Sequence, residues 1–402
     1  MFFKRAPRER LDRVIKLYLA YKFFGALYFT YPIFYEFASR TITPVQVGMF
    51  FSVIAMCGLI ADIPTAIVAD KRSRKFSALV GVGLLAVAPV AVLVGTSFPM
   101  YIVAALFYGL GGAFMSGTLE SLVYDHKNVT KAMYRRVNAF EITYGQAGIL
   151  VSAACGGVLF SISHGAPFVT QAATGIICVV LIALMQEQYK ESHVRSVVSS
   201  RKHFSQSLKH LLATPYLRVI VLMGVVFSVM LGMCIQFVNE AAMIEHGMQG
   251  AVRGFLVSGA GVATLIILNF FLLRWLKSDA ARILYLGCGA AVAYVCMSLG
   301  SLPLFLLGYL MWCCLNVTSS FIRVMIQDHI PGSHRSTIMS SFKTLAVLVG
   351  LGASTGTGIL VQWAHTPRAA YALFASIAFV ILLPCALWLT AHLKKLESEV
   401  SL

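Results

Sequence analysis

The sequence DIPTAIVADKRSRK, residues 62–75, places an acid and a proline inside an apolar run and closes that run with four cations in five residues. The chain has little charge elsewhere, because 58% of its 402 residues are hydrophobic and only 12% are charged. A soluble domain carries about twice that share of charged residues. The composition therefore predicts a chain that folds in lipid, and residues 62–75 mark a point where it leaves the bilayer.

Segments of about 20 apolar residues recur along the whole chain, and each is long enough to cross a hydrocarbon core of about 30 Å as a helix. The ten-residue alternation typical of a transmembrane β-barrel is absent, so helices that satisfy their own backbone are expected. The predicted fold class is an all-α integral membrane protein with 12 transmembrane helices. The predicted spans are 13–37, 45–69, 76–97, 99–125, 139–163, 165–186, 216–240, 252–276, 280–300, 302–327, 338–362 and 367–392.

Lysine and arginine are distributed unevenly between the two sides of these spans. With the N-terminus in the cytoplasm, 28 of the 32 lie in or near segments that face the cytoplasm. This is the positive-inside bias, and an even number of spans then places both termini in the cytoplasm. Topology thus accounts for the net charge of +16, and no nucleic-acid partner is expected. The four cations outside this set are Lys22, Arg40, Arg253 and Arg368.

The polar, basic connection 187–215 divides six predicted spans from six. We therefore expect an N-terminal six-helix half over 1–186, a cytoplasmic central loop over 187–215 and a C-terminal six-helix half over 216–402. This layout is typical of transporters built from repeats, in which the substrate path runs between the halves. Because each copy would contain a complete path, a functional monomer is expected.

The stretch that ends the second span resembles a loop pattern of the major facilitator superfamily, G-x-x-x-D-R-x-G-R-[R/K]. The preceding DIPT is similar to the E-I-P-T found before this loop in many bacterial permeases and drug-efflux proteins. Two positions depart from the pattern, since Ala66 and Ser73 stand where it has glycine. The charged positions are occupied by Asp70, Lys71, Arg74 and Lys75.

Three further segments resemble the same superfamily. SGTLESLVYD, residues 116–125, is similar to S-G-x-x-E-A-x-x-Y-D, and HIPGSHRSTIMSS, residues 329–341, is similar to x-I-P-x-x-x-R-A-T-x-L-S. The fifth span echoes the antiporter pattern G-x-x-x-G-P-x-x-G-G over residues 148–157, without its Gly-Pro pair. Small residues at this density also let helices pack closely, which is the alternative interpretation of that segment.

The resemblance implies a secondary active transporter in a bacterial inner membrane, most simply a proton-coupled exporter of a small organic molecule that works by alternating access. An importer or facilitator of a small metabolite is the alternative, followed by a membrane enzyme or sensor on the same fold. No phosphate-binding loop, catalytic constellation, cofactor site or metal-ligand cluster is recognisable. The resemblance also implies that residues 70–75 act as a cytoplasmic latch loop whose Asp70 meets the start of span eleven. The alternative is that these cations only orient the helices.

Ionisable residues inside the predicted spans are the candidates for coupling and binding, because charges in a bilayer are costly and usually face a cavity. Lys22 and Asp62 lie about 12 to 13 Å from the cytoplasmic ends of their spans. Lys22 is expected to pair with Asp62 or with an acid of span four, to bind an anionic group, or to assist a carboxylate that carries the proton. The remaining candidates are Glu120, Asp125 and Glu141 in the first half and Asn316 and Lys343 in the second.

Tyrosines in the first span are candidates for substrate contact. Tyr28 and Tyr31 recur with Phe24 and Tyr35 at helical spacing and would form one aromatic wall, with a kink at Pro32. Aromatic walls suit flat apolar or cationic ligands. The alternative is an interfacial belt, in which tyrosine hydroxyls lie at headgroup level.

Overall fold

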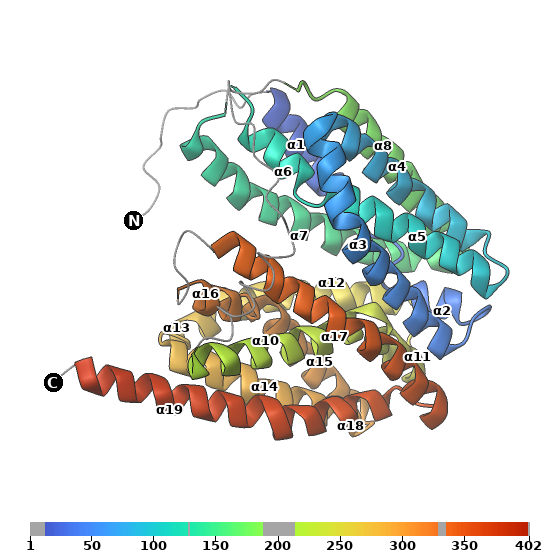
Figure 1. Ribbon diagram of the computed structural model, residues 1–402. Coiled ribbons are helices and arrows are strands. Elements are labelled where there is room, and N and C mark those ends of the chain that lie inside the picture. Colours follow the sequence, from blue (N-terminus) through green and yellow to red (C-terminus); the bar gives the residue numbers. More distant parts are fainter. Residues whose placement is uncertain (1–12, 128, 188–213, 329–334, 401–402) are drawn as a thin grey trace.

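The computed structural model describes residues 13–127, 129–187, 214–328 and 335–400, and every regular element in these ranges is a helix (Figure 1). Eleven helical segments there are long and apolar enough to cross a membrane. They match predicted spans two to twelve, and the prediction of an all-α membrane protein is confirmed. The first predicted span is divided into two shorter helices, and its place in the bundle is consistent with a twelfth span.

The helices of the first half run from α1 to α8. Their bounds are α1 Arg13–Gly25, α2 Phe34–Ala38, α3 Pro44–Lys71, α4 Arg74–Leu93, α5 Phe98–Met115, α6 Thr118–Tyr124, α7 Lys131–Ile162 and α8 Ala166–Ala183. The second half runs from α10 to α19. Its helices are α10 Pro215–Met233, η1 Cys234–Val238, α11 Asn239–Glu245, α12 Gly250–Ile267, η2 Leu268–Leu272, α13 Leu273–Trp275, α14 Asp279–Ser298, α15 Leu302–Thr318, α16 Ser320–Asp328, α17 Arg335–Ala364, α18 Arg368–Ile377, η4 Ala378–Leu382 and α19 Leu383–Val400.

Hydroxyl side chains cap the starts of several long helices and so satisfy backbone N–H groups that lack a partner within the helix. Thr43 and Gln46 form a reciprocal capping box before α3, and Ser73 caps α4 through the N–H of Phe76. Thr214 caps α10, whose first residue is a proline with its backbone already suited to a helix start. These local signals begin the helices where the hydropathy pattern predicts them.

The first predicted span, 13–37, is wrong as a continuous helix. Helix α1 ends at Gly25, and residues 26–33 form turns before α2 begins. The turns lie directly against α7, because a methyl group at Gly156 would overlap the carbonyl oxygen of Phe29. Pro32 has no N–H to continue a helix, and its carbonyl oxygen accepts a hydrogen bond from Arg253 instead.

The helices form two bundles that meet through a few elements (Figure 1). In the first bundle α4 packs on α5 and α8, and α1 packs on α7 and α8; in the second, α14 packs on α15, α18 and α19. The principal contacts between the bundles are α3 with α17 and α7 with α12. The described residues up to Glu187 build the first bundle and those from Thr214 build the second, while residues 188–213 of the predicted central loop lie outside the described residues.

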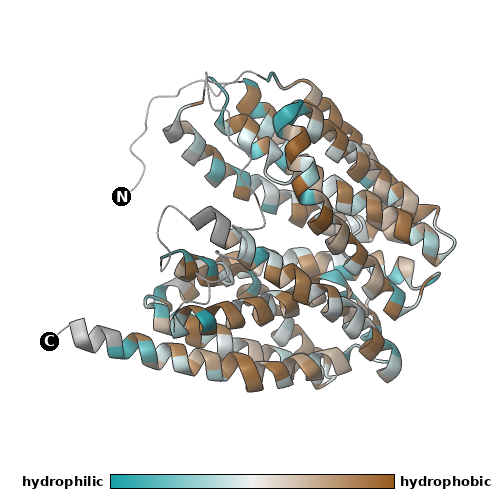
Figure 2. Cartoon of the chain, in the orientation of Figure 1, coloured by the Kyte–Doolittle hydropathy of each residue, from teal (hydrophilic) through white to brown (hydrophobic). Residues whose placement is uncertain are grey.

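The two ends of the molecule differ in charge. The basic end, as the term is used below, is where α3 ends and α4 and α7 begin; the opposite end is where α3 and α12 begin. Hydrophobic residues cover the long helices, and hydrophilic ones gather toward helix ends (Figure 2). Charged side chains between the ends are few, so each is informative.

Candidate functional site

A cluster of three charges joins α1, α6 and α7. The Nζ atom of Lys22 lies 2.5 Å from Glu120 Oε1 and 2.6 Å from Glu141 Oε1. The three side chains are between 18% and 35% exposed, so the cluster is half-buried. Tyr18 extends it, because its hydroxyl donates a 2.8 Å hydrogen bond to Glu141 Oε2. Lys22, Glu120 and Glu141 are termed the Lys22 cluster.

Two glycines allow the helices of the Lys22 cluster to converge. Gly117 separates α5 from α6 with a φ of 67°, a left-handed conformation that favours glycine, and Glu120 follows in the first turn of α6. A methyl group at Gly148 would lie 2.6 Å from the carbonyl oxygen of Phe23, so α7 packs on the backbone of α1. Glu141 lies two helical turns before Gly148 on the same face and therefore points at α1.

The Lys22 cluster sets two carboxylates against one ammonium group. With both carboxylates ionised it carries one net negative charge, which a single proton neutralises. Lys22 and Tyr18 engage both oxygens of Glu141, whereas Glu120 Oε2 is buried without a hydrogen-bond partner. An unmatched buried oxygen is costly on a charged group. Glu120 is therefore the less completely satisfied of the two carboxylates.

Of the partners considered for Lys22, the structure selects the acid of span four and adds one from span five. Asp62 is exposed on α3, and its side chain makes no ion pair or hydrogen bond within the described part of the chain. The reason is packing, since α1 lies against α7 and α8 and not against the exposed face of α3. Asp62 is thus separate from the Lys22 cluster.

The second part of the latch loop is attached to its own bundle. Arg74 Nη1 lies 2.6 Å from Asp125 Oδ2 and 2.9 Å from the carbonyl oxygen of Ser121. Lys75 Nζ donates to two carbonyl oxygens at the end of α8, at 2.6 and 2.8 Å. Asp125 therefore holds α4 against α6 and does not belong to the Lys22 cluster.

The first part of the latch loop is exposed. Asp70 and Lys71 form the last turn of α3, so that only residues 72–73 lie between the helices. Neither side chain makes an ion pair with any residue that the structure describes. The predicted contact of Asp70 with the start of span eleven falls on residues 329–338, whose side chains lie outside the described residues.

The remaining predicted site residues are distributed over both halves. Tyr28 and Tyr31 lie in the turns between α1 and α2, so the prediction of one aromatic wall along a single helix is wrong: the helix ends before them. Tyr28 is 48% exposed. Asn316 is partly buried in α15, and Lys343 is exposed on α17. None of these four makes a side-chain hydrogen bond or ion pair with the Lys22 cluster.

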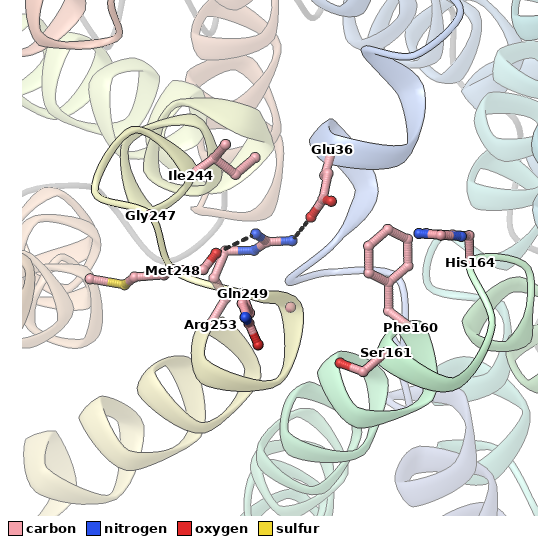
Figure 3. A pocket seen from close by; sticks show the side chains of 10 residues that line it. Glu36, Phe160, Ser161, His164, Ile244, Gly247, Met248, Gln249 and Arg253 are labelled. Atoms are coloured by element: carbon pink, nitrogen blue, oxygen red, sulfur yellow. Dashed lines mark hydrogen bonds and ion pairs between the residues drawn. The ribbon is translucent and has the colours of Figure 1, made fainter.

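At the opposite end, a buried arginine joins the two bundles. Arg253 in α12 is 1% exposed, and its guanidinium donates to the carbonyl oxygens of Pro32 and Met248 at 3.0 and 2.7 Å. It also forms an ion pair with Glu36 of α2 (Figure 3). The buried carboxylate of Glu240 accepts the N–H groups at the start of α2, with distances of 2.7 and 2.9 Å. Arg253, Glu36 and Glu240 are termed the Arg253 closure.

The Arg253 closure borders a cavity of about 480 Å³ that both bundles line (Figure 3). Phe160, Ser161 and His164 come from the first bundle, and Met248 and Gln249 from the second. Glu36 and Arg253 of the Arg253 closure also line it, so the cavity lies where the closure joins the bundles.

The sequence does not single out Glu36 or Glu240 by the cost of charge in lipid, but it does contain a signal for the Arg253 closure. The four cations that depart from the positive-inside bias all have an acidic partner in the structure. Besides Lys22 and Arg253, Arg40 lies 3.4 Å from Glu36 and Arg368 lies 2.7 Å from Glu245. A cation that departs from the positive-inside pattern is thus, in each of these four cases, part of an ion pair.

Glycines bring the two bundles into backbone contact near the Arg253 closure. Methyl groups at Gly157 and Gly254 would overlap carbonyl oxygens across the contact of α7 with α12, and one at Gly48 would overlap the Ser354 carbonyl across α3 and α17. A methyl group at Gly358 would lie 2.5 Å from a carbonyl oxygen of α3. Any side chain at these positions forces the bundles apart.

Replacing Gly157 with alanine is therefore expected to open this end. Ser354, which is 1% exposed, supplies a reporter when changed to cysteine in a background without the native cysteines. In detergent, Gly157→Ala should raise its maleimide labelling rate severalfold. The matched control is Gly145→Ala on the same helix, because nothing lies within 4 Å of a methyl group there. Equal labelling in the two variants would contradict the close-contact argument.

Comparisons with known proteins agree with this architecture. The crystal structure of nucleoside transporter NupG superposes with a TM-score of 0.70 at 14% identity, covering 93% of this chain and 98% of that one. A bacterial homologue of the human lysosomal transporter Spinster, inward-facing and unoccupied, gives 0.66 at 14% identity over 94% of each chain. A D-xylose-proton symporter gives 0.67 at 12% identity over 94% of this chain and 97% of that one. At such identities these likenesses describe the fold alone.

Sequence comparison identifies the family directly. No curated protein matches the chain significantly. The sequence does match the Major Facilitator Superfamily over residues 17–353, which includes the Lys22 cluster, the latch loop and the Arg253 closure. The chain is therefore a multi-pass membrane protein that belongs to the Major Facilitator Superfamily, whose members transport small molecules.

Proposed function

We propose that this protein is a proton-coupled exporter of a small organic molecule and that it works by alternating access. The observation that carries the proposal is the Lys22 cluster, in which one ammonium group is shared by two carboxylates and Glu120 keeps a buried oxygen without a partner. Burial favours the neutral form of an acid and a nearby cation favours the charged form, so a cluster of two acids and one cation that opens during the cycle is suited to carrying a proton. Export is supported by the resemblance to bacterial drug-efflux proteins.

The basic end is proposed to face the cytoplasm of a bacterial cell, with both termini on that side. On that orientation the Arg253 closure and the glycine contacts shut the extracellular end, and we propose that this arrangement is the inward-facing state. Transport requires these contacts to break while others form at the basic end. Tyr28, Tyr31 and Asn316 are proposed to contact the substrate, and a single chain is proposed to suffice.

Proton movement in everted membrane vesicles tests the proposal. A pH-gradient dye is followed while lipophilic cations, organic acids and neutral metabolites are added. One compound class is expected to dissipate the gradient, and Glu120→Gln should abolish this response. The matched control is Asp279→Asn, which neutralises an exposed acid paired with Arg282 on its own helix and should leave the response unchanged. An unchanged response in Glu120→Gln would contradict coupling at the Lys22 cluster.

An importer or facilitator of a small metabolite is the second candidate. It is favoured by one observation, the absence of the Gly-Pro pair from the antiporter-like segment 148–157. The structure gives these glycines a packing role. Gly148 of α7 packs against the backbone of α1, and Gly156 of α7 packs against the turns that follow α1. Uptake of a metabolite by intact cells, together with no dye response in everted vesicles, would favour this candidate over export.

The latch loop is proposed to close the basic end in the other state. Arg74 and Lys75 already hold the start of α4, while Asp70 is exposed and available for a partner across the bundles. Asp70→Asn is expected to lower transport at least severalfold without lowering the amount of protein in the membrane. Lys71→Gln serves as control for the alternative that the loop only orients the helices. It removes a cation of the loop, so it should change how the protein inserts into the membrane and not the transport rate of the inserted protein. Normal transport by Asp70→Asn would exclude the latch.

A further inference from the structure

The contact between α3 and α17 defines a register that extends beyond the residues now touching. The two helices run antiparallel, and Gly48 meets Ser354 while Gly358 meets Pro44. Ser52 Oγ lies 2.7 Å from the carbonyl oxygen of Leu351, one turn closer to the basic end. For each residue toward the C-terminus of α3, the residue opposite it is thus one position closer to the N-terminus of α17.

This register sets Asp62 opposite Ser340 and Lys343 opposite Leu59. Both charges lie on the contacting faces, because Asp62 is within about 40° of Gly48 around α3, and Lys343 is within about 20° of Ser354 around α17. The axial offset between the two charges is three residues, or about 4.5 Å. A lysine side chain spans such an offset.

The direction of the side chains reduces this offset. In a helix each Cα–Cβ bond tilts toward the N-terminus. Helix α3 begins at the opposite end, so the side chain of Asp62 leans away from the basic end. Helix α17 begins at the basic end, so that of Lys343 leans toward it. When the helices are side by side, the two charges therefore lean toward one another.

In this structure the two charges are apart. The helices lie together near α2 and α11 and diverge toward the basic end (Figure 1). Asp62 and Lys343 are both exposed, and no ion pair joins either to another described residue. Each belongs to a membrane-crossing segment, where an uncompensated charge is costly unless it faces water or a partner.

We propose that Asp62 and Lys343 form an ion pair between the bundles when the protein closes at its basic end. The pair is the counterpart of the Arg253 closure. The Asp62–Lys343 pair would join the bundles at the basic end, whereas the Arg253 closure joins them at the opposite end, and the two contacts would not exist in the same state. The proposal rests on the alternating access proposed above, but on neither the direction of transport nor the proton. It assigns these charges to the conformational cycle and not to the coupling site.

Disulfide formation across α3 and α17 tests the pair without a substrate. Ile63→Cys and Met339→Cys, which the same register sets opposite one another, are introduced into a background without the native cysteines. A protease site within residues 187–215 separates the halves unless they are cross-linked. Oxidation with copper phenanthroline is expected to cross-link the two halves. Asp62→Asn or Lys343→Gln should lower the cross-linking yield about fivefold, because losing a favourable exposed ion pair lowers the population of the closed state by about that factor.

Charge exchange completes the test. The double variant Asp62→Lys/Lys343→Asp should restore the cross-linking yield. The control Asp62→Lys/Lys277→Asp reverses a cation in the connection between α13 and α14 instead, and it should not restore the yield. No cross-linking with the native charges, or equal yields in all variants, would overturn the pair. Because this assay uses neither a proton gradient nor export, its outcome is separable from that of the vesicle experiment.

Discussion

Replacing Arg253 with methionine is expected to lower the free energy of unfolding by about 3 to 5 kcal/mol, the usual cost of removing one partner of a buried ion pair. The side chain of Arg253 is 2% exposed, and its loss deprives two carbonyl oxygens of their donor and leaves Glu36 only its longer, exposed contact with Arg40. Methionine fills a similar volume, so the effect reports lost polar contacts and not a cavity. Unfolding by denaturant in mixed micelles measures the change.

Arg40→Met is the matched control for Arg253→Met, because Arg40 contacts the same carboxylate at 3.4 Å but is 46% exposed. It should cost less than about 1 kcal/mol. The double variant Arg253→Met/Glu36→Gln should recover part of the loss, since it removes the carboxylate that has lost its buried partner. Equal effects of the two arginine variants would show that burial of Arg253 is not what stabilises the contact.

Replacing Lys22 with methionine is expected to abolish proton-coupled transport and to lower stability by about 2 kcal/mol. The variant leaves Glu120 and Glu141 without their shared cation, and the stability loss is less than for Arg253 because the Lys22 cluster is less buried than Arg253. The vesicle assay measures transport, and thermal unfolding in detergent measures stability.

A second substitution separates the two effects of losing Lys22. Lys22→Met/Glu141→Gln should recover stability, because one carboxylate no longer opposes another, but it should not recover transport. Proton movement at the normal rate in Lys22→Met would contradict the coupling role of the Lys22 cluster while leaving its structural role intact.

Most of the fold could be predicted from the sequence because lipid imposes a simple rule: a helix must be apolar for about 20 residues and end near charge or a cap. Spans two to twelve obey it. The interruption of the first span does not follow from this rule, since residues 26–33 are as apolar as a helix interior. Their turns depend on contacts with Gly156 and Arg253, which are distant in sequence.

The sequence predicts that charged residues belong to the candidate site, but it does not predict which of them pair with one another. The cost of charge in lipid singles out Lys22 and the acids near its depth. Depth along a helix, however, says nothing of which helix lies beside it, so Asp62 and Glu120 were equivalent partners until packing placed α6 and α7 against α1. The same rule does not single out Glu36 and Glu240, because they lie near span ends, where acids are common.

On the proposed coupling mechanism, the unequal charge of the Lys22 cluster would also make transport sensitive to the membrane potential. Two carboxylates and one ammonium group carry a net negative charge when no proton is bound, and none when Glu120 is protonated. A potential of 100 mV acts on one elementary charge with about 2.3 kcal/mol over the full membrane, and with a proportionate fraction over part of it. If the cluster carries the proton as proposed, its own contribution to the electrical work of reorientation is present without the proton and absent with it, so the two halves of the cycle would differ in their response to voltage.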